Sequence, residues 1–288
     1  MVIAPAAVAV LSAWRANQQL HPKRTTGGSY DLSAELASSE AVAFTSSDGI
    51  PLAGTFVAPR NGAVVVLAHG LAADRVQLLG EAQLLVEHGY GILLFDERAH
   101  GASGGSLSTW GYLESGDVER AVDFIGQRTQ LSVGQIGLLG FSIGGTAVVR
   151  AAIGDPRIGA VIVEADFGSV ADEFRYMFQR YGPLSQLPAL WAIQASGLDL
   201  AALEPDRMLR SLHPRPLLLV YGSHDSSVPA TEALRMARSA GPLSSLLMID
   251  TAEHGGFIRT ATAQYSERLI SFLDTSLLRR GSGRGILF

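Results

Sequence analysis

The chain has 288 residues, of which 47% are hydrophobic and 17% are charged, and its formal net charge is −5. This length and composition predict a globular protein with a sizeable core, in one large α/β domain or two small ones. The negative charge argues against a nucleic-acid-binding protein, and the absence of cysteine excludes disulfides, cysteine nucleophiles and thiolate metal sites.

The first stretch of the chain, Val2–Trp14, is apolar and is followed by Arg15. It is short for a membrane-spanning helix and lacks the basic n-region of a signal peptide. Three interpretations stay open: a packed N-terminal helix, an interfacial helix in peripheral contact with a membrane, or the end of an anchor. We expect a cytoplasmic protein, with membrane association through this segment as the alternative. A polar linker over His21–Glu40 completes the N-terminal region 1–40.

From Ala41 onward, strand patterns alternate with helix patterns. The first two predicted strands, Ala41–Thr45 and Leu52–Val57, flank a turn that contains Asp-Gly and so predict a hairpin. The later predicted strands are short apolar runs: Ala63–Ala68, Gly91–Phe95, Gln135–Leu139, Ala160–Val163, Pro216–Tyr221 and Leu243–Ile249. The predicted helices have apolar residues at helical spacing: Asp74–His88, Tyr112–Gln127, Thr146–Ala152, Ala230–Ala240 and Thr260–Leu278.

This alternation predicts a parallel sheet that is covered by helices on both faces. The predicted domain spans residues 41–279, with the aromatic segment 168–215 as an inserted helical lid and residues 280–288 as a loose tail. In such sheets, ligands bind at the carboxyl ends of the strands. The polar residues that follow predicted strands are His69, Asp96, Ser142, Asp166, Asp225 and His254.

Ser142 occupies the centre of a Gly-x-Ser-x-Gly pattern between a predicted strand and a predicted helix. A turn of this kind strains the serine so that its hydroxyl stands above the sheet, and the helix N-terminus faces developing negative charge. Ser103 lies in a second match to the pattern, but no predicted helix begins there. Ser142 is therefore the favoured nucleophile.

A serine hydroxyl needs a base to take its proton, and the base needs an acid to hold its tautomer. The chain offers candidates in the order Ser142, Asp225, His254. His254 is favoured as the base because the other histidines fall in linkers, at helix ends, before glycines or beside Asp225. Asp225 competes for the role of the acid with Asp166 and Asp250.

These residues together resemble the α/β-hydrolases, in the branch of serine esterases, monoacylglycerol-lipase-like enzymes and serine-aminopeptidase-like enzymes. The motifs that carry the resemblance span roughly Ala41–Leu278: His69-Gly70, Asp96-x-Arg98-x-His100-Gly101-x-Ser103, Gly140-x-Ser142-x-Gly144, Gly222-x-x-Asp225-x-x-Val228-Pro229 and His254-Gly255. Ala99 departs from the family, which usually has glycine at this position.

The resemblance implies the α/β-hydrolase fold, a mostly parallel twisted sheet with helices on both faces and a small helical lid. It also implies catalytic Ser142, Asp225 and His254, with an oxyanion hole formed by the backbone amides of Leu71 and Ile143. Aromatic side chains near and within the lid either form an apolar acyl or alcohol pocket or only pack the lid onto the body. The pocket candidates are Phe167, Phe174, Met177, Phe178 and Trp191.

The sequence thus predicts a serine hydrolase that cleaves a carboxylic ester, or a related acyl bond, of a small molecule through an acyl-enzyme on Ser142, without a metal or cofactor. No acidic pair in the lid is evident for a substrate amine, which favours an ester over a peptide. A peptidase, a thioesterase or an acyltransferase would use the same machinery, and a non-catalytic binding protein of this fold is a further alternative. A nucleotide-binding oxidoreductase is disfavoured, because Ser142 stands where a close-packed glycine is needed.

Overall fold

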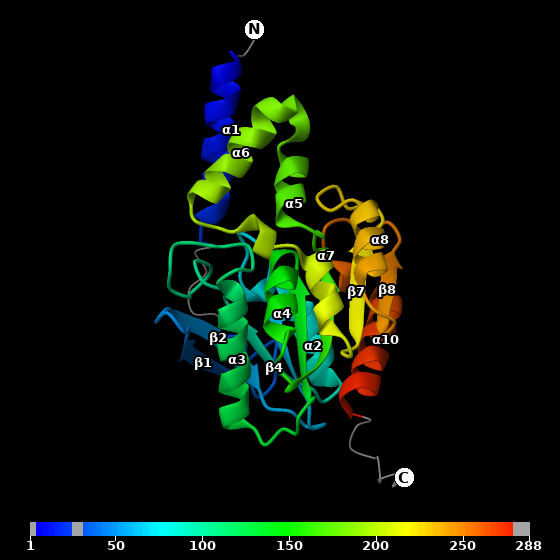
Figure 1. Cartoon of the computed structure of the whole chain (residues 1–288). Helices are drawn as coiled ribbons and strands as arrows, with labels where there is room; N and C mark the ends of the chain where they lie inside the picture. The colour runs from blue at the N-terminus through cyan, green and yellow to red at the C-terminus, as the bar shows by residue number, and fades with distance from the viewer. Residues whose placement is uncertain (1–3, 25–30, 279–288) are drawn as a thin grey trace.

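The computed structural model describes residues 4–24 and 31–278, and the described strands form one sheet of eight (Figure 1). Their order across the sheet is β1-β2-β4-β3-β5-β6-β7-β8. The strands are β1 (Glu40–Thr45), β2 (Pro51–Val57), β3 (Val64–Ala68), β4 (Gly91–Phe95), β5 (Ile136–Phe141), β6 (Ile158–Glu164), β7 (Leu217–Gly222) and β8 (Ser244–Ile249). The β1–β2 and β2–β4 pairs are antiparallel and the remaining pairs are parallel, which confirms the predicted fold class.

The five strands from β3 to β7 are apolar runs because both faces of the sheet are covered. Every residue of these strands is buried. The β1–β2 hairpin turns through Asp48 and Gly49, where Gly49 has a φ of 86° that favours glycine. The apolar runs and the Asp-Gly turn were therefore reliable signals of this sheet.

Helices pack on both faces of the sheet through separate apolar clusters. The helices of one face are α3 (Glu114–Arg128), α4 (Ile143–Ala152) and α8 (Ala230–Ser239). The helices of the other face are α2 (Leu79–Glu87), the short α9 (Phe257–Thr260) and α10 (Thr262–Leu273). Val148 of α4 and Met236 of α8 are fully buried in the first cluster, and Leu85 of α2 and Leu269 of α10 in the second.

Two of the predicted helices are each built from two kinds of helical structure. The segment predicted as a helix over 74–88 begins with a 3-10 turn, Arg75–Leu78, before α2. The side chain of Asp74 caps this turn, because its Oδ1 accepts a hydrogen bond from the amide of Val76 at 3.0 Å. The segment predicted over 260–278 contains α10, which then widens into a π-helical stretch, Asp274–Leu278.

The segment 168–215, predicted as a lid, connects β6 to β7 and is helical. Its α-helices are α5 (Val170–Met177), α6 (Pro183–Ala195) and α7 (Pro205–Met208). Ser169 caps α5, because its Oγ accepts a hydrogen bond from the amide of Asp172 at 3.4 Å. α5 and α6 stand above the carboxyl end of the sheet, where the polar loops lie (Figure 1).

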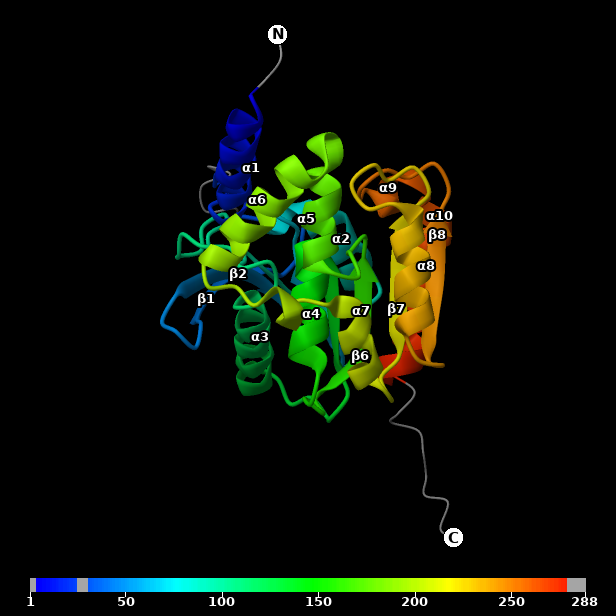
Figure 2. The same ribbon diagram turned by 45° about the horizontal axis from the view of Figure 1, so that its top comes forward.

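The N-terminal segment forms helix α1 (Pro5–Leu20), which lies along α6 (Figures 1 and 2). Ala16 and Leu20 of α1 are fully buried in a cluster with residues of the lid, so α1 is packed against the lid along part of its length. No helix among residues 4–24 and 31–278 is both long and apolar enough to cross a membrane. Val2, where the apolar segment was predicted to begin, and the predicted tail 280–288 lie outside the described residues.

Candidate active site

Ser142 stands on a sharp turn between β5 and α4, with backbone angles φ 53° and ψ −123°. Glycine is required on both sides of it. A Cβ atom on Gly140 would lie 2.2 Å from the carbonyl oxygen of Gly144, and one on Gly144 would lie 2.3 Å from that of Ala68. The amide of Ser142 donates to the carbonyl of Glu164 at 2.8 Å, which fixes the strained turn to the neighbouring strand. This is the local geometry that the Gly-x-Ser-x-Gly pattern predicts.

His254 faces the hydroxyl of Ser142 from the loop that follows β8. Its Nε2 lies 3.3 Å from Ser142 Oγ, and its ring lies 4.9 Å from the ring of Phe141. Gly255 and Gly256 follow it with φ values of 85° and 67°, and a Cβ on Gly255 would meet the Phe141 ring at 2.9 Å. The loop can therefore bring His254 this close only with glycine at the next position.

Asp225, on the loop after β7, is the carboxylate that contacts His254. Its Oδ2 lies 2.8 Å from Nδ1 of His254, and its side chain is fully buried. Its Oδ1 accepts hydrogen bonds from the amides of Ser227 and Val228 at 2.7 and 2.8 Å. Ser142, His254 and Asp225 therefore form one continuous line of polar contacts.

The two competing carboxylates have other partners. Asp166, at the end of β6, is buried and accepts from Thr146 Oγ1 at 3.0 and 3.2 Å. Burial raises the pKa of Asp166 well above its ordinary value. Asp250 is exposed, and its Oδ1 accepts from Ser223 Oγ at 3.0 Å. Among the contacts of the described residues, only Asp225 of these three reaches His254.

The backbone amides of Leu71 and Ile143 donate no hydrogen bond to another described residue. Ile143 is the first residue of α4, so its amide is one of those that an α-helix leaves without an internal partner. The loop of Leu71 is held by His100, whose Nε2 accepts from the amide of Ala72 at 3.1 Å. Burial lowers the pKa of His100 below its ordinary value, which keeps the ring neutral and able to accept.

A second neutral histidine braces the same region. His69 Nε2 accepts from the amide of Glu97 at 3.0 Å, and its Nδ1 lies 2.8 Å from the carbonyl of Gly70. Burial lowers the pKa of His69 to about 3. Ala99, at the position where the family usually has glycine, takes a φ of 64°, so the loop keeps the left-handed conformation despite the side chain.

Ser103, the nucleophile of the rejected pattern, serves as a structural hydrogen-bonding group. It is 1% exposed. Its Oγ donates to the carbonyl of Asp96 at 2.6 Å and accepts from the amide of Ala53 at 2.9 Å. No histidine ring among the described residues forms a hydrogen bond with this Oγ. Ser103 therefore has no base at hand and joins the loop after β4 to strand β2.

The aromatic residues predicted for a substrate pocket take several different places. Phe174 is fully buried, and its ring lies 4.7 Å from that of Trp110 and 6.1 Å from that of Phe178. Phe167 is buried in the cluster that carries α3 and α4. Met177 and Trp191 are 43% and 68% exposed. Trp191 lines a groove of about 500 Å³ on the outer side of the lid, with residues of α5, α6 and the segment 200–207.

A cavity of about 490 Å³ reaches His254 and Phe141, and the sequence patterns did not predict it. Two buried carboxyl groups line it, Glu81 of α2 and Glu164 at the end of β6. Burial raises the pKa of Glu81 to about 7 and that of Glu164 well above its ordinary value, and each is close enough to influence the other. The available signal was the place of Glu81 on α2, on the same face as buried Leu84 and Leu85.

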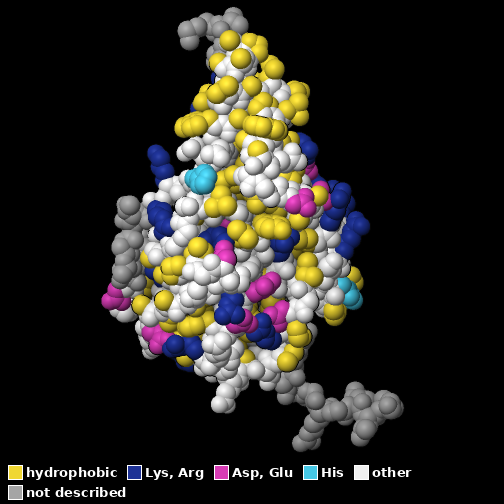
Figure 3. Space-filling model, turned by 60° about the vertical axis from the view of Figure 1, so that its left-hand side comes forward, with side chains coloured by type: hydrophobic (Ala, Val, Ile, Leu, Met, Phe, Trp, Pro, Cys, Tyr) yellow, Lys and Arg dark blue, Asp and Glu magenta, His cyan; other side chains and the backbone are white. Residues whose placement is uncertain are grey.

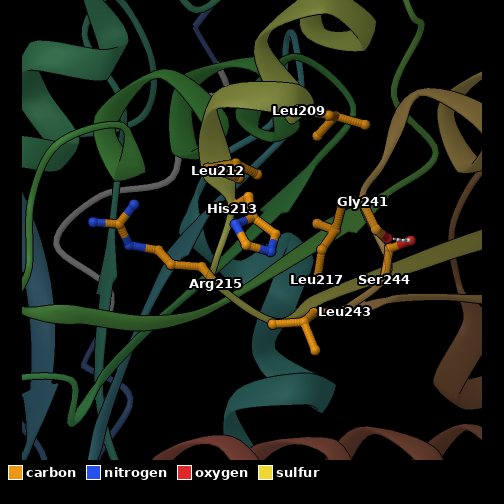
Figure 4. Close-up of a pocket in the computed structure, with 8 residues that line it drawn as sticks. All are labelled: Leu209, Leu212, His213, Arg215, Leu217, Gly241, Leu243 and Ser244. Carbon is orange, nitrogen blue, oxygen red and sulfur yellow. Dashed lines mark hydrogen bonds between the residues drawn. The ribbon is translucent and has the colours of Figure 1, made fainter.

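The cavity drawn in Figure 4 lies at the other end of the sheet and is far smaller. That cavity lies at the start of β7 and β8, beside Leu217 and Ser244, and has a volume of about 10 Å³ (Figure 4), about the room of one water molecule. No group of three or more His, Cys, Asp or Glu side chains in the described part of the chain is arranged to hold a metal ion.

Comparison with known proteins supports the assignment of the fold and of the hydrolase class. The family model described as X-Pro dipeptidyl-peptidase (S15 family) matches residues 12–256. The protein YfhR of Escherichia coli O157:H7 is 28% identical over 250 residues, which are 83% of this chain and 82% of that protein. A thiohydrolase of Aspergillus aculeatus, AneE, is 31% identical over 137 residues, which are 44% of this chain and 42% of that protein.

A solved structure of an esterase from Pyrococcus furiosus has the same fold. It superposes with a TM-score of 0.76 at 21% sequence identity, and the match covers 90% of this chain and 98% of that one. At this level of identity the likeness establishes the α/β-hydrolase fold, not the substrate.

Proposed function

Because this chain belongs to the S15 family, described as X-Pro dipeptidyl-peptidases, we propose that it is a serine hydrolase with Ser142 as its nucleophile. The observation that carries the proposal is the line of contacts from Ser142 Oγ through His254 to Asp225, at 3.3 and 2.8 Å. A serine beside an oriented histidine is the arrangement that activates a hydroxyl for attack on a carbonyl carbon.

In the proposed reaction, His254 Nε2 takes the hydroxyl proton while Ser142 Oγ attacks the carbonyl carbon of an ester. Asp225 accepts a hydrogen bond from Nδ1–H of His254, which holds the required tautomer and stabilises the imidazolium that forms. The tetrahedral intermediate carries its negative charge on the former carbonyl oxygen. The amides of Leu71 and Ile143 are the donors proposed for that oxygen, and the N-terminus of α4 adds its dipole.

The cycle then closes with water. His254 returns its proton to the leaving alcohol as the C–O bond breaks, which leaves an acyl group on Ser142. His254 next takes a proton from a water molecule, whose oxygen attacks the acyl carbon. Collapse of the second tetrahedral intermediate releases the carboxylic acid and restores the hydroxyl of Ser142. Each ester bond consumes one water molecule and needs no other reactant.

A carboxylic ester is the proposed substrate because the longest helix of the lid, α6, offers no charged group to a substrate ammonium. A dipeptidyl-peptidase must hold the ammonium group of its substrate, which calls for an ionised carboxylate near the nucleophile. Glu173 of α5 is an acidic lid residue whose pKa is raised well above its ordinary value by desolvation, with further contributions from the charges of Asp166, Asp225 and Glu232. Helix α6 carries no charged residue.

Release of X-Pro dipeptides from a peptide is the second candidate, because the description of the family favours it. An ammonium group bound beside Glu173 would itself stabilise the ionised carboxylate. The two candidates differ in substrate, not in the nucleophile, so they are separated by measuring turnover of p-nitrophenyl esters of graded chain length against X-Pro-p-nitroanilides. Faster turnover of the esters supports the first candidate, and turnover of the anilides alone supports the second.

The nucleophile is tested by labelling the intact protein with a fluorophosphonate probe and mapping the adduct by peptide mass spectrometry. We expect the adduct on Ser142, its loss in Ser142→Ala, and its retention in the matched control Ser103→Ala. An adduct on Ser103 would overturn the choice of nucleophile. A folded protein that takes no label and hydrolyses none of these substrates would favour a non-catalytic binding protein.

A further inference from the structure

The helices α1 and α6 form a two-helix arm that projects from the body above the lid helix α5 (Figures 1 and 2). The arm consists of residues 5–20 and 183–195. On α1 the buried side chains recur every four residues, at Val8, Ser12, Ala16 and Leu20, so one face of the helix packs inward. The opposite face of α1 and the outer face of α6 have no covering element among the described residues.

Large apolar side chains gather on these outer faces. On α1, Val10, Leu11 and Trp14 are 70%, 46% and 57% exposed, and on α6, Leu187 and Trp191 are 64% and 68% exposed. The space-filling view shows the resulting apolar surface over the projecting end of the molecule (Figure 3). Scattered apolar residues are normal on a protein surface, whereas a gathering of this kind marks a place of contact.

The charge distribution of the arm selects the partner. The arm itself carries one charged side chain, Arg15, and the flanking residues 21–24 and 174–182 add four basic side chains and no acidic one, although the whole chain has a net charge of −5. The four flanking residues are Lys23, Arg24, Arg175 and Arg180, of which Arg175 forms an ion pair with Asp172. A second copy docked arm to arm would bring like charges together, which opposes association. An anionic lipid surface would instead attract the arm and turn the acidic remainder of the protein away.

We propose that the arm inserts into the headgroup region of a bilayer that contains anionic phospholipid, with Trp14 and Trp191 as its interfacial anchors. Tryptophan is enriched at this depth because its ring is apolar and its N–H is polar. A helix pair with an apolar outer surface and basic flanks binds in the plane of the interface without crossing the membrane. This inference concerns where the protein acts and does not depend on the proposed ester substrate.

The arm also connects such a surface to the candidate active site. Ala16 and Leu20 of α1 belong to the same apolar cluster as Ile143, the residue after Ser142. A bilayer that holds the arm would therefore lie on the same side of the molecule as the carboxyl end of the sheet. Lipid-soluble acyl compounds would then reach Ser142 from the membrane side.

The test is binding of the full chain to vesicles of phosphatidylcholine with 30% phosphatidylglycerol, measured by co-sedimentation and by tryptophan fluorescence. Of the three tryptophans, Trp110 is buried and Trp14 and Trp191 are exposed, so the two anchors dominate any change. We expect a blue shift on binding, quenching by brominated lipid, and weaker binding to phosphatidylcholine alone or at high salt.

Three variants make the test specific. The double variant Trp14→Ser/Trp191→Ser should bind at least about tenfold more weakly, given that it removes both interfacial anchors. Arg15→Gln/Arg180→Gln should weaken binding to the anionic vesicles while leaving the apolar surface intact. Leu234→Ser, a substitution of a half-exposed residue on α8, is the matched control and should bind as the unmodified chain does. Thermal melts establish that each variant is folded.

The proposal is overturned if the unmodified chain does not bind the anionic vesicles, or if the double tryptophan variant binds them equally well. A stable dimer in the absence of lipid, abolished by the same double variant and accompanied by no vesicle binding, would assign the surface to a second copy instead. Because neither readout uses hydrolysis, failure of the proposed ester substrate would leave this result unaffected.

Discussion

The substitution Asp225→Asn separates two roles of one side chain. Oδ1 of Asp225 accepts from the amides of Ser227 and Val228, and Oδ2 faces Nδ1 of His254. An asparagine can keep its oxygen toward the two amides, and its NH2 group then faces Nδ1 as a donor. To accept a hydrogen bond from this NH2 group, Nδ1 of His254 must be unprotonated. The ring then carries its proton on Nε2, the atom that faces Ser142. In that tautomer the histidine cannot accept the serine proton.

The expected loss is large and specific to turnover. A triad base in the wrong tautomer loses about 10⁴-fold in kcat, which corresponds to about 5.5 kcal/mol of transition-state stabilisation. KM should change little, because Asp225 contacts His254 and backbone amides rather than the space above Ser142. The melting temperature should also change little, because both backbone hydrogen bonds survive. The assay is hydrolysis of a p-nitrophenyl ester, with kcat and KM determined separately, beside a thermal melt.

Asp166→Asn is the matched control, with the same chemical change at the end of the neighbouring strand. Asp166 contacts Thr146 rather than His254, and its pKa is raised by burial, so the loss of its charge should not disturb the line from Ser142 to Asp225. Turnover should stay close to that of the unmodified protein. A slower Asp166→Asn enzyme than Asp225→Asn enzyme would refute the reasoning and make Asp166 the acid.

Three further predictions test the structure around the site. Ser103→Ala should keep full turnover but lower the free energy of unfolding by about 1–3 kcal/mol, because the partly buried amide of Ala53 loses its acceptor and the carbonyl of Asp96 loses its donor. Denaturant melts and ester hydrolysis check this, and loss of turnover would count against a structural Ser103. Gly144→Ala should destabilise the fold by about 3 kcal/mol or more, because its Cβ would lie 2.3 Å from the backbone carbonyl oxygen of Ala68. Gly154→Ala, with open space around the same atom and a φ of 83°, should cost about 1–2 kcal/mol, so equal melting temperatures for the two variants would contradict the packing argument. Glu81 has a folded-state pKa raised from 4.5 to about 7, so the folded chain binds more protons than the unfolded chain in this range and stability falls as pH rises through it. Glu81→Gln removes that loss and should raise the melting temperature at pH 8 but not at pH 4.5, and an equal effect at both values would show that Glu81 does not titrate in this way.

The sequence determined the sheet and the order of its functional loops. Strands buried on both faces read as short apolar runs, so Gly91–Phe95 was predicted with the bounds that the structure has. The turn at Ser142 was also predictable from the sequence. Gly140 and Gly144 lie so close to neighbouring backbone that only glycine fits at these positions. Each of these features is set by residues that lie close together in the chain, so a local sequence pattern is enough to predict it.

The tertiary structure alone decided which distant groups meet. Asp166, Asp225 and Asp250 all follow strands of the sheet, and only the path of each loop brings the carboxylate of Asp225 to His254. The pairing of α1 with α6, the cavity beside His254 and the burial of Phe174 against Trp110 arise in the same way. Each of these contacts joins segments that are far apart in the chain. A local sequence pattern indicates which face of a helix or strand is apolar, but it does not indicate which other element will cover that face.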